Sequence, residues 1–237
     1  MKTLYRISDG GYKKEKLEFA DKFYCLENYL KVFGSQGLIV FADNVKDETF
    51  ARLSTYPIQL IRTNEGSSAQ SWKYVAKYAL QNFDLDEIVY FLEDDYLHKE
   101  NAPKAIKEGL EIADYVTLYD HPDKYIDGTK GGNHLVVDGG EQTKVFLTKS
   151  SHWKQTNSTT MTFACKLQTL KDDFDIWDKY TQGSLPNDDL IFYRLQSLKK
   201  LKFKFFGKNR KLISPIPGYS THVEKAYLSP LIDWNKV

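Results

Sequence analysis

The chain has 237 residues, 41% of them hydrophobic, which is enough to bury a sizeable core. Its 33 basic and 32 acidic residues leave a formal net charge of +1, so the basic field that gathers nucleic acid is lacking and no nucleic-acid partner is expected. The sequence starts without an apolar signal-like region, and no stretch approaches the ~18 uninterrupted apolar residues of a membrane span, so a soluble, cytoplasmic protein without an integral membrane segment is expected.

The first 100 residues alternate between strand and helix patterns. Strands are expected over 3–7, 38–44, 58–66 and 87–92. An apolar stripe from Phe19 to Phe33 predicts a helix that Gly34 ends, and a second helix is expected from Ser67 to Phe83, with the serine as a capping residue. This order predicts an α/β fold whose mixed, mainly parallel sheet is flanked by helices.

The second half is less regular. Its elements are expected in this order: a helix at about 101–112, a strand running into a polar loop over 114–125, a flexible glycine-rich hairpin over 128–140, two strands around a turn over 143–166, helices near 166–180 and 188–200, and an extended surface tail over 212–237. Three of the seven prolines lie in that tail. No internal repeat or linker divides the chain, so a single domain over 1–237 is predicted.

Three consecutive carboxylates, Glu93, Asp94 and Asp95, follow directly on the apolar run 88–92. The carboxyl end of a parallel strand lies in the crevice where open α/β sheets bind ligands. Mutual repulsion and burial would raise the pKa values of the three carboxyl groups unless a cation compensates, and carboxylates select hard cations such as Mg²⁺ or Mn²⁺. The alternative is a solvated loop whose carboxylates cap the helix that follows.

An apolar strand that ends in an acidic triplet about 90 residues into an α/β chain resembles the DXD motif of nucleotide-sugar glycosyltransferases of the GT-A fold. The resemblance implies a Rossmann-like domain, with residues 1–100 as the nucleotide-sugar-binding half and residues 101–237 as the acceptor-binding half and tail. It implies that Asp95 holds Mn²⁺ or Mg²⁺ on the donor diphosphate. Glu93 would lie near the ribose or at the metal, and Asp94 would be among the donor contacts.

Two later segments resemble motifs of the same family. Asp188 and Asp189 follow Asn187 and resemble the acidic pair that opens a helix near the acceptor in inverting members. Asp189 is predicted to be the general base, with Asp188 as the alternative. His222 resembles the C-terminal histidine that completes the metal site or contacts the diphosphate. Ordinary helix capping and an incidental histidine are the structural alternatives.

The ends of the first three strands are predicted to form the donor pocket. The candidate residues are Arg6, Ser8, Asp43, Asn44, Asn64, Gly66 and Ser67. Asp43 can accept from the imino N–H of uracil, and the helix beginning near Ser67 offers backbone N–H groups. The same residue types also occur at ordinary turns and caps. Arg62 and Lys154 are weaker candidates for contacts to the diphosphate.

Two polar stretches are predicted to face the acceptor. In the first, Trp153 can stack on a sugar while His152, Thr159 and Thr160 form hydrogen bonds to it, although these residues also suit an ordinary polar-faced strand. In the second, Asp120 and His121 follow an expected strand and suit an acceptor-side wall or a solvated loop.

The resemblance therefore implies a metal-dependent glycosyltransferase. It would move a sugar from a nucleotide-sugar donor, with a UDP-sugar favoured, to a hydroxyl of a glycan or another acceptor, and would invert the anomeric centre through an aspartate base. Three alternatives remain open. A nucleotidyltransferase acting on sugar phosphates would need a better phosphate loop than residues 6–16, and a receiver-like signalling domain would carry its acidic pair after the first strand. A non-catalytic metal- or carbohydrate-binding module is the third.

Overall fold

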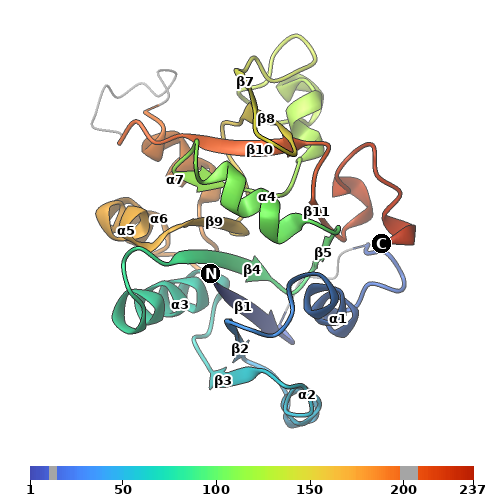
Figure 1. Cartoon of the computed structure of the whole chain (residues 1–237), viewed down its shortest axis with the longest axis vertical. Coiled ribbons are helices and arrows are strands. Elements are labelled where there is room, and N and C mark those ends of the chain that lie inside the picture. The colour runs from blue at the N-terminus through green and yellow to red at the C-terminus, as the bar shows by residue number, and fades with distance from the viewer. Residues whose placement is uncertain (11–14, 198–207) are drawn as a thin grey trace.

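The computed structural model describes residues 1–10, 15–197 and 208–237. Within these ranges a nine-stranded sheet has the spatial order β3-β2-β1-β4-β9-β6-β10-β8-β7, with helices on both faces (Figure 1). The elements of the first half are β1 (Lys2–Ser8), α1 (Lys22–Phe33), β2 (Leu38–Asp43), α2 (Asp47–Leu53), β3 (Gln59–Thr63), α3 (Ser68–Asn82) and β4 (Ile88–Glu93). Strands β3, β2, β1 and β4 pair in parallel, as their order with intervening helices predicts.

Helix α1 begins later than its apolar stripe suggests. Asp21 caps the helix by accepting the backbone N–H groups of Phe23 and Tyr24 at 2.9 and 2.8 Å, and Phe19 stays outside the helix and exposed. Gly34 ends the helix as predicted, with φ of 75° and its N–H bonded to Leu30. Helix α2 was not predicted, because seven residues are too few to show a helical period.

The second half adds shorter elements. They are β5 (Tyr96–His98), α4 (Ala102–Gly109), β6 (Tyr115–Val116), β7 (Val145–Leu147), β8 (His152–Gln155), β9 (Phe163–Lys166), α5 (Leu167–Asp172), α6 (Phe174–Tyr180), α7 (Asp188–Leu195), β10 (Leu212–Ile216) and β11 (Ser220–His222). Strand β9 runs antiparallel between β4 and β6, and β11 pairs with β5 in a separate two-stranded sheet.

Three predictions for this half were wrong. Residues 143–166 form three strands instead of two, and the glycine-rich segment 128–140 forms a short 3-10 turn and one isolated bridge instead of a hairpin. Residues 212–216 are a sheet strand between β6 and β8, with Leu212 and Ile213 fully buried, and not a surface tail. The predicted helix 188–200 ends at Leu195, and its positions 198–200 lie outside the described residues.

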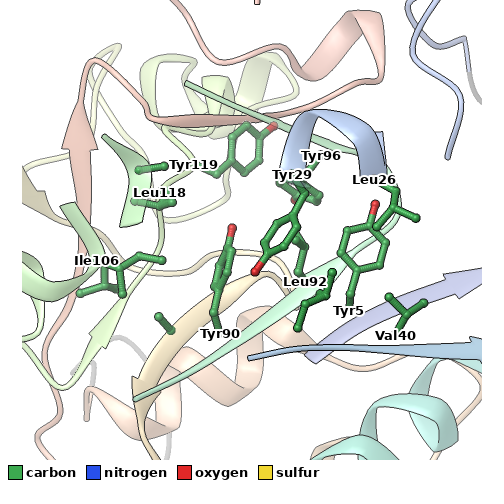
Figure 2. Close-up of a cluster of buried hydrophobic side chains, with 14 of the residues drawn as sticks. Tyr5, Leu26, Tyr29, Val40, Tyr90, Leu92, Tyr96, Ile106, Leu118 and Tyr119 are labelled. Atoms are coloured by element: carbon green, nitrogen blue, oxygen red, sulfur yellow. The ribbon is translucent and has the colours of Figure 1, made fainter. Parts of the chain in front are cut away.

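The core has two layers because β4 is buried on both faces. Tyr90 and Leu92 point to one face and Val89 and Phe91 to the other, as alternation along a strand requires. Figure 2 shows the first layer, where side chains of the sheet meet Leu26 and Tyr29 of α1 and Ile106 of α4. In the second layer α3, α5, α6 and α7 cover the sheet, and Trp72 stacks on Trp177 with ring centroids 4.7 Å apart. At its carboxyl end, the apolar strand β4 therefore leaves the core at Glu93.

The predicted fold class, an α/β domain with a mixed sheet flanked by helices, is confirmed. Among the residues that the structure describes, no helix is long and apolar enough to cross a lipid bilayer.

Candidate active site

The carboxyl ends of β1, β2 and β4 meet at one edge of the sheet, because the three strands are parallel and in register. There the Arg6 guanidinium lies 2.9 Å from Oε1 of Glu93 and donates to the backbone carbonyl of Ser68 at 3.0 Å. The Thr162 hydroxyl lies 3.4 Å from the other oxygen of the Glu93 carboxylate. Arg6 thus holds Glu93 in place and ties β1 and β4 to the first turn of α3.

The middle carboxylate of the triplet, Asp94, accepts the backbone N–H of Ser8 at 2.9 Å. Burial raises the pKa of Asp94 to about 6, and the neighbouring Asp95 adds to this shift. Negative charge is therefore held here at a free-energy cost, which a bound cation would relieve.

The last carboxylate of the triplet meets the C-terminal histidine. Asp95 Oδ2 lies 3.0 Å from His222 Nε2 and 3.5 Å from Nζ of Lys16. The antiparallel pairing of β5 with β11 sets Tyr96 opposite His222 and so creates this contact. Nδ1 of His222 accepts the backbone N–H of Glu224 at 3.2 Å, so Nε2 is the ring nitrogen that faces Asp95.

Asp95 and His222 suit a hard divalent cation only in part. No group of three or more His, Cys, Asp or Glu side chains in the described residues is arranged to hold a metal ion. One carboxylate oxygen and one imidazole nitrogen are, however, a donor pair that Mn²⁺ or Mg²⁺ accepts when phosphate oxygens and water fill the other positions. The raised pKa of Asp94 is consistent with a bound cation, because the positive charge of the ion would stabilise the neighbouring carboxylates.

The second acidic motif opens α7. Asn187 caps the helix, its side-chain oxygen accepting the N–H of Leu190 at 3.2 Å, so the capping interpretation of this residue is confirmed. Burial raises the pKa of Asp188 to about 7, and repulsion from Asp189 and Glu93 adds to the shift. A carboxylate with a pKa near neutrality is suited to removing a proton at neutral pH.

The predicted donor residues after β2 and β3 form one group. Asp43 is buried and accepts from the Thr63 hydroxyl at 3.0 Å, the Glu65 N–H at 2.8 Å and the Asn44 side-chain amide at 2.9 Å. Its carboxylate therefore organises the loop ends of both strands. Beside it lies a cavity of about 420 Å³, lined by Asn44, Val45, Arg62, Thr63 and Asn64.

Arg62 and the start of α3 complete this side. Arg62 donates to the Val45 carbonyl at 3.1 Å and pairs with Asp47 at 2.7 Å, at the rim of the cavity. Gly66 turns the chain with φ of 76°, a value that favours glycine, and Ser67 caps α3 by accepting the N–H of Gln70 at 3.2 Å.

Within the described ranges, most of the residues predicted to bind the acceptor make no contact with the acidic residues and instead contact other parts of the fold. Trp153 is fully buried and its indole N–H donates to Thr148 at 2.9 Å, so its ring presents no face to a sugar, whereas His152 is exposed on β8. Thr159 is buried and donates to the Thr117 hydroxyl at 3.0 Å. Thr160 is the member of this group that lies near the acidic residues, with its hydroxyl 2.7 Å from that of Tyr96.

Asp120 and His121 form local pairs. Asp120 is completely buried and pairs with Nζ of Lys154 at 2.9 Å, while the Tyr125 hydroxyl donates to it at 2.7 Å. His121 Nδ1 lies 2.8 Å from a carboxylate oxygen of Asp123. Lys154 is thus bound to Asp120 and is not placed against the donor pocket.

Three residues contact the acidic site that sequence reasoning did not place there: Ser68, Thr162 and Lys16. Ser68 directly follows the capping serine of α3, which is a local signal. Thr162 reaches Glu93 through the antiparallel pairing of β9 with β4, which no local pattern indicates.

No family model matches the sequence, and no curated protein matches it. Among solved structures, GalNAc-T7 with UDP, GalNAc and Mn²⁺ is similar, with a TM-score of 0.53 and 9% identity over 90% of this chain and 42% of that one. A CMP:2-keto-3-deoxy-manno-octonic acid synthetase complexed with CTP gives a TM-score of 0.48 and 12% identity, covering 92% of this chain and 91% of that one. A 4-diphosphocytidyl-2C-methyl-D-erythritol synthase from Anaerococcus prevotii gives a TM-score of 0.48 and 13% identity, covering 90% of this chain and 87% of that one.

The chain spans less than half the length of the GalNAc-T7 chain. At such low identity the likeness shows the fold alone. The α/β fold shared with the GalNAc-T7 structure is GT-A-like. The predicted fold is confirmed at this level.

Proposed function

We propose that the chain is a metal-dependent glycosyltransferase that moves a sugar from a nucleotide diphosphate donor, with a UDP-sugar favoured, to an acceptor hydroxyl. One observation carries the proposal. Asp95 and His222 come from distant segments, and their side chains lie 3.0 Å apart just beyond the carboxyl end of β4, where open α/β sheets bind ligands. A purely structural acidic loop gives no reason for a histidine from the far end of the chain to meet it there.

The donor would lie across the carboxyl ends of β1, β2 and β4. Asp95 and His222 would hold a Mn²⁺ or Mg²⁺ ion, which when bound neutralises charge on the departing diphosphate. The nucleobase of the donor would enter the cavity lined by Asn44 and Arg62. Arg6 would hold the Glu93 carboxylate in position to contact the ribose.

Asp188 is the better candidate for the general base. Its carboxylate would take the proton of the acceptor hydroxyl as that oxygen forms a bond to the anomeric carbon, while the bond from that carbon to the diphosphate breaks on the opposite face. This sequence inverts the anomeric centre. The pKa of about 7 leaves a substantial ionised fraction at neutral pH, and Asp189 helps to raise it. Asp189, the residue preferred from the sequence, then acts through Asp188.

The test is release of UDP from UDP-glucose, UDP-galactose, UDP-GlcNAc and UDP-GalNAc, each with and without Mn²⁺. We expect metal-dependent release from at least one donor, with Asp95→Asn and Asp188→Asn both inactive. The matched assay is release of pyrophosphate from CTP or UTP with a sugar phosphate. Pyrophosphate release without any UDP release would replace the proposal with a nucleotidyltransferase, and inactivity in both assays would leave a binding module.

A further inference from the structure

The segment around Lys16 lies at the acidic site, although it comes long before the acidic triplet in the chain. Leu17 donates its backbone N–H to the Val223 carbonyl at 3.0 Å, and Lys16 forms an isolated antiparallel bridge with Glu224. Val223 in turn donates its N–H to the Asp95 carbonyl at 2.9 Å. The backbone at Lys16 is therefore held beside both the acidic triplet and the end of β11.

A small hydrophobic cluster, separate from the two core layers, anchors this segment. It joins the segment to α1, β5 and the C-terminal residues, and Figure 1 shows α1, β5 and β11 side by side. Neighbouring side chains of an extended backbone point to opposite sides, so Leu17 enters the cluster while Lys16 points away from it, toward Asp95. The buried members of the cluster are Leu17, Ala20, Cys25, Leu97, Val223 and Trp234.

The Lys16 ammonium group reaches the atom at the centre of the candidate metal site. Its Nζ lies 3.5 Å from Oδ2 of Asp95, the same oxygen that lies 3.0 Å from Nε2 of His222. The Lys16 side chain is 35% exposed. Ion pairs that are partly open to solvent stabilise a fold little, because water screens the charges and the lysine stem loses rotamer freedom. Lys16 can therefore leave Asp95 at small cost, by rotation about its own side-chain bonds.

Lysine at this place is suited to binding a phosphate group. Its ammonium group is a compact charge with three N–H donors at the end of a flexible stem. A divalent cation on Asp95 would repel that charge, whereas diphosphate oxygens would attract it. Lys22, at the same edge of the sheet, is in contrast held by Asp9 at 2.6 Å and by the Ser8 carbonyl.

We propose that Lys16 binds the diphosphate of the donor. In the empty site its ammonium group compensates part of the Asp95 charge, and with the donor bound it donates to phosphate oxygens. The proposal rests on the proposed function, because it takes a nucleoside diphosphate at the carboxyl end of β4 as the ligand. The chain itself then supplies one of the cations that hold this ligand.

The test compares two kinds of binding in the same variants. Calorimetry with UDP, GDP, dTDP and CDP, each with Mn²⁺, selects the diphosphate that the parent binds best. We expect Lys16→Met to lower the affinity for this diphosphate about tenfold or more, and Lys16→Arg to stay close to the parent, because both cations donate to phosphate. Binding of Mn²⁺ alone, followed by the electron paramagnetic resonance of the free ion, should be as tight or tighter in Lys16→Met, since no ammonium group competes for Asp95.

Lys225→Met is the matched control. It removes one exposed positive charge from the same pair of segments, where its Nζ lies 3.2 Å from Glu15, and it should bind the diphosphate as the parent does. An equal loss of affinity in this control would show a long-range effect of charge and overturn the proposal. Weaker binding of both Mn²⁺ and the diphosphate in Lys16→Met would assign Lys16 a structural role, which also overturns it.

Two outcomes separate this proposal from the proposed function. If the parent binds a diphosphate with Mn²⁺ and Lys16→Met binds it equally well, the role of Lys16 is wrong while the proposed function stands. If the parent binds none of the four diphosphates, the proposed function and the role of Lys16 are both wrong.

Discussion

Replacing Asp188 by asparagine should stabilise the folded chain at neutral and alkaline pH. The pKa of this carboxyl group rises from 3.8 to about 7, mainly through burial and then through Asp189. One pKa unit corresponds to about 1.4 kcal/mol, so about three units give an upper limit of about 4 kcal/mol. The side chain retains some contact with solvent, which screens its charge, and we therefore expect a gain of about 2–3 kcal/mol.

The pH dependence of this gain follows from proton linkage. Between about pH 4 and pH 7 the folded state holds the Asp188 proton more tightly than the unfolded state, so the stability that this group contributes is lost as pH rises through the window. The asparagine variant lacks this loss. The difference in unfolding free energy between the variant and the parent should therefore grow from about pH 4 to pH 7 and stay constant above it.

Urea denaturation at a series of pH values from about 4.5 to 8.5 measures this difference. Glu111→Gln is the control, because it removes one negative charge from an exposed position on the surface. A variant that is less stable than the parent at pH 8, or a gain in stability that does not change with pH, would refute the reasoning about Asp188.

Three further predictions concern the same site. Asp188→Asn should lower the transfer rate by about 10²–10⁴-fold with donor binding unchanged, and should remove the rise of kcat/KM through pH 7; full activity would exclude this base. Asp95→Asn should remove the Mn²⁺-dependent part of nucleotide binding in calorimetry while circular dichroism stays unchanged; unaltered binding would exclude Asp95 as a ligand. Arg6→Met should lower the unfolding free energy by about 2–3 kcal/mol in urea, because Glu93 loses its ion-pair partner, with partial recovery in Arg6→Lys; no loss would show that the pair contributes nothing.

The parts of the fold that the sequence predicts are those with a local cause. Strands β2 and β4 are apolar runs, and α3 follows a capping serine, so each shows its pattern within a few residues. Strand β10 was mistaken for a tail because Pro215 and Pro217 suggest irregular structure. Its place in the sheet depends on pairing with β6 and β8, which lie far away in the sequence and override local propensity.

The candidate site shows the same division. The order of the acidic triplet, acidic pair and histidine is visible in the sequence, but the contact between Asp95 and His222 depends on two three-residue strands, β5 and β11. The preference for Asp188 over Asp189 rests on burial, which is a tertiary property. Alternation in β8 sends one of His152 and Trp153 to the core, and only the assembled sheet shows that it is Trp153.

The central claim is that the carboxyl end of β4 binds a nucleoside diphosphate through a divalent metal. Thermal unfolding of the chain with UDP, GDP, dTDP, CDP and CTP, each with and without Mn²⁺, tests it most directly. A ligand at a hundred times its dissociation constant stabilises the folded state by about 2.7 kcal/mol. We predict a higher midpoint with one nucleoside diphosphate only when Mn²⁺ is present, and no such rise in Asp95→Asn. No shift with any nucleotide, or the same shift in Asp95→Asn, would contradict the claim.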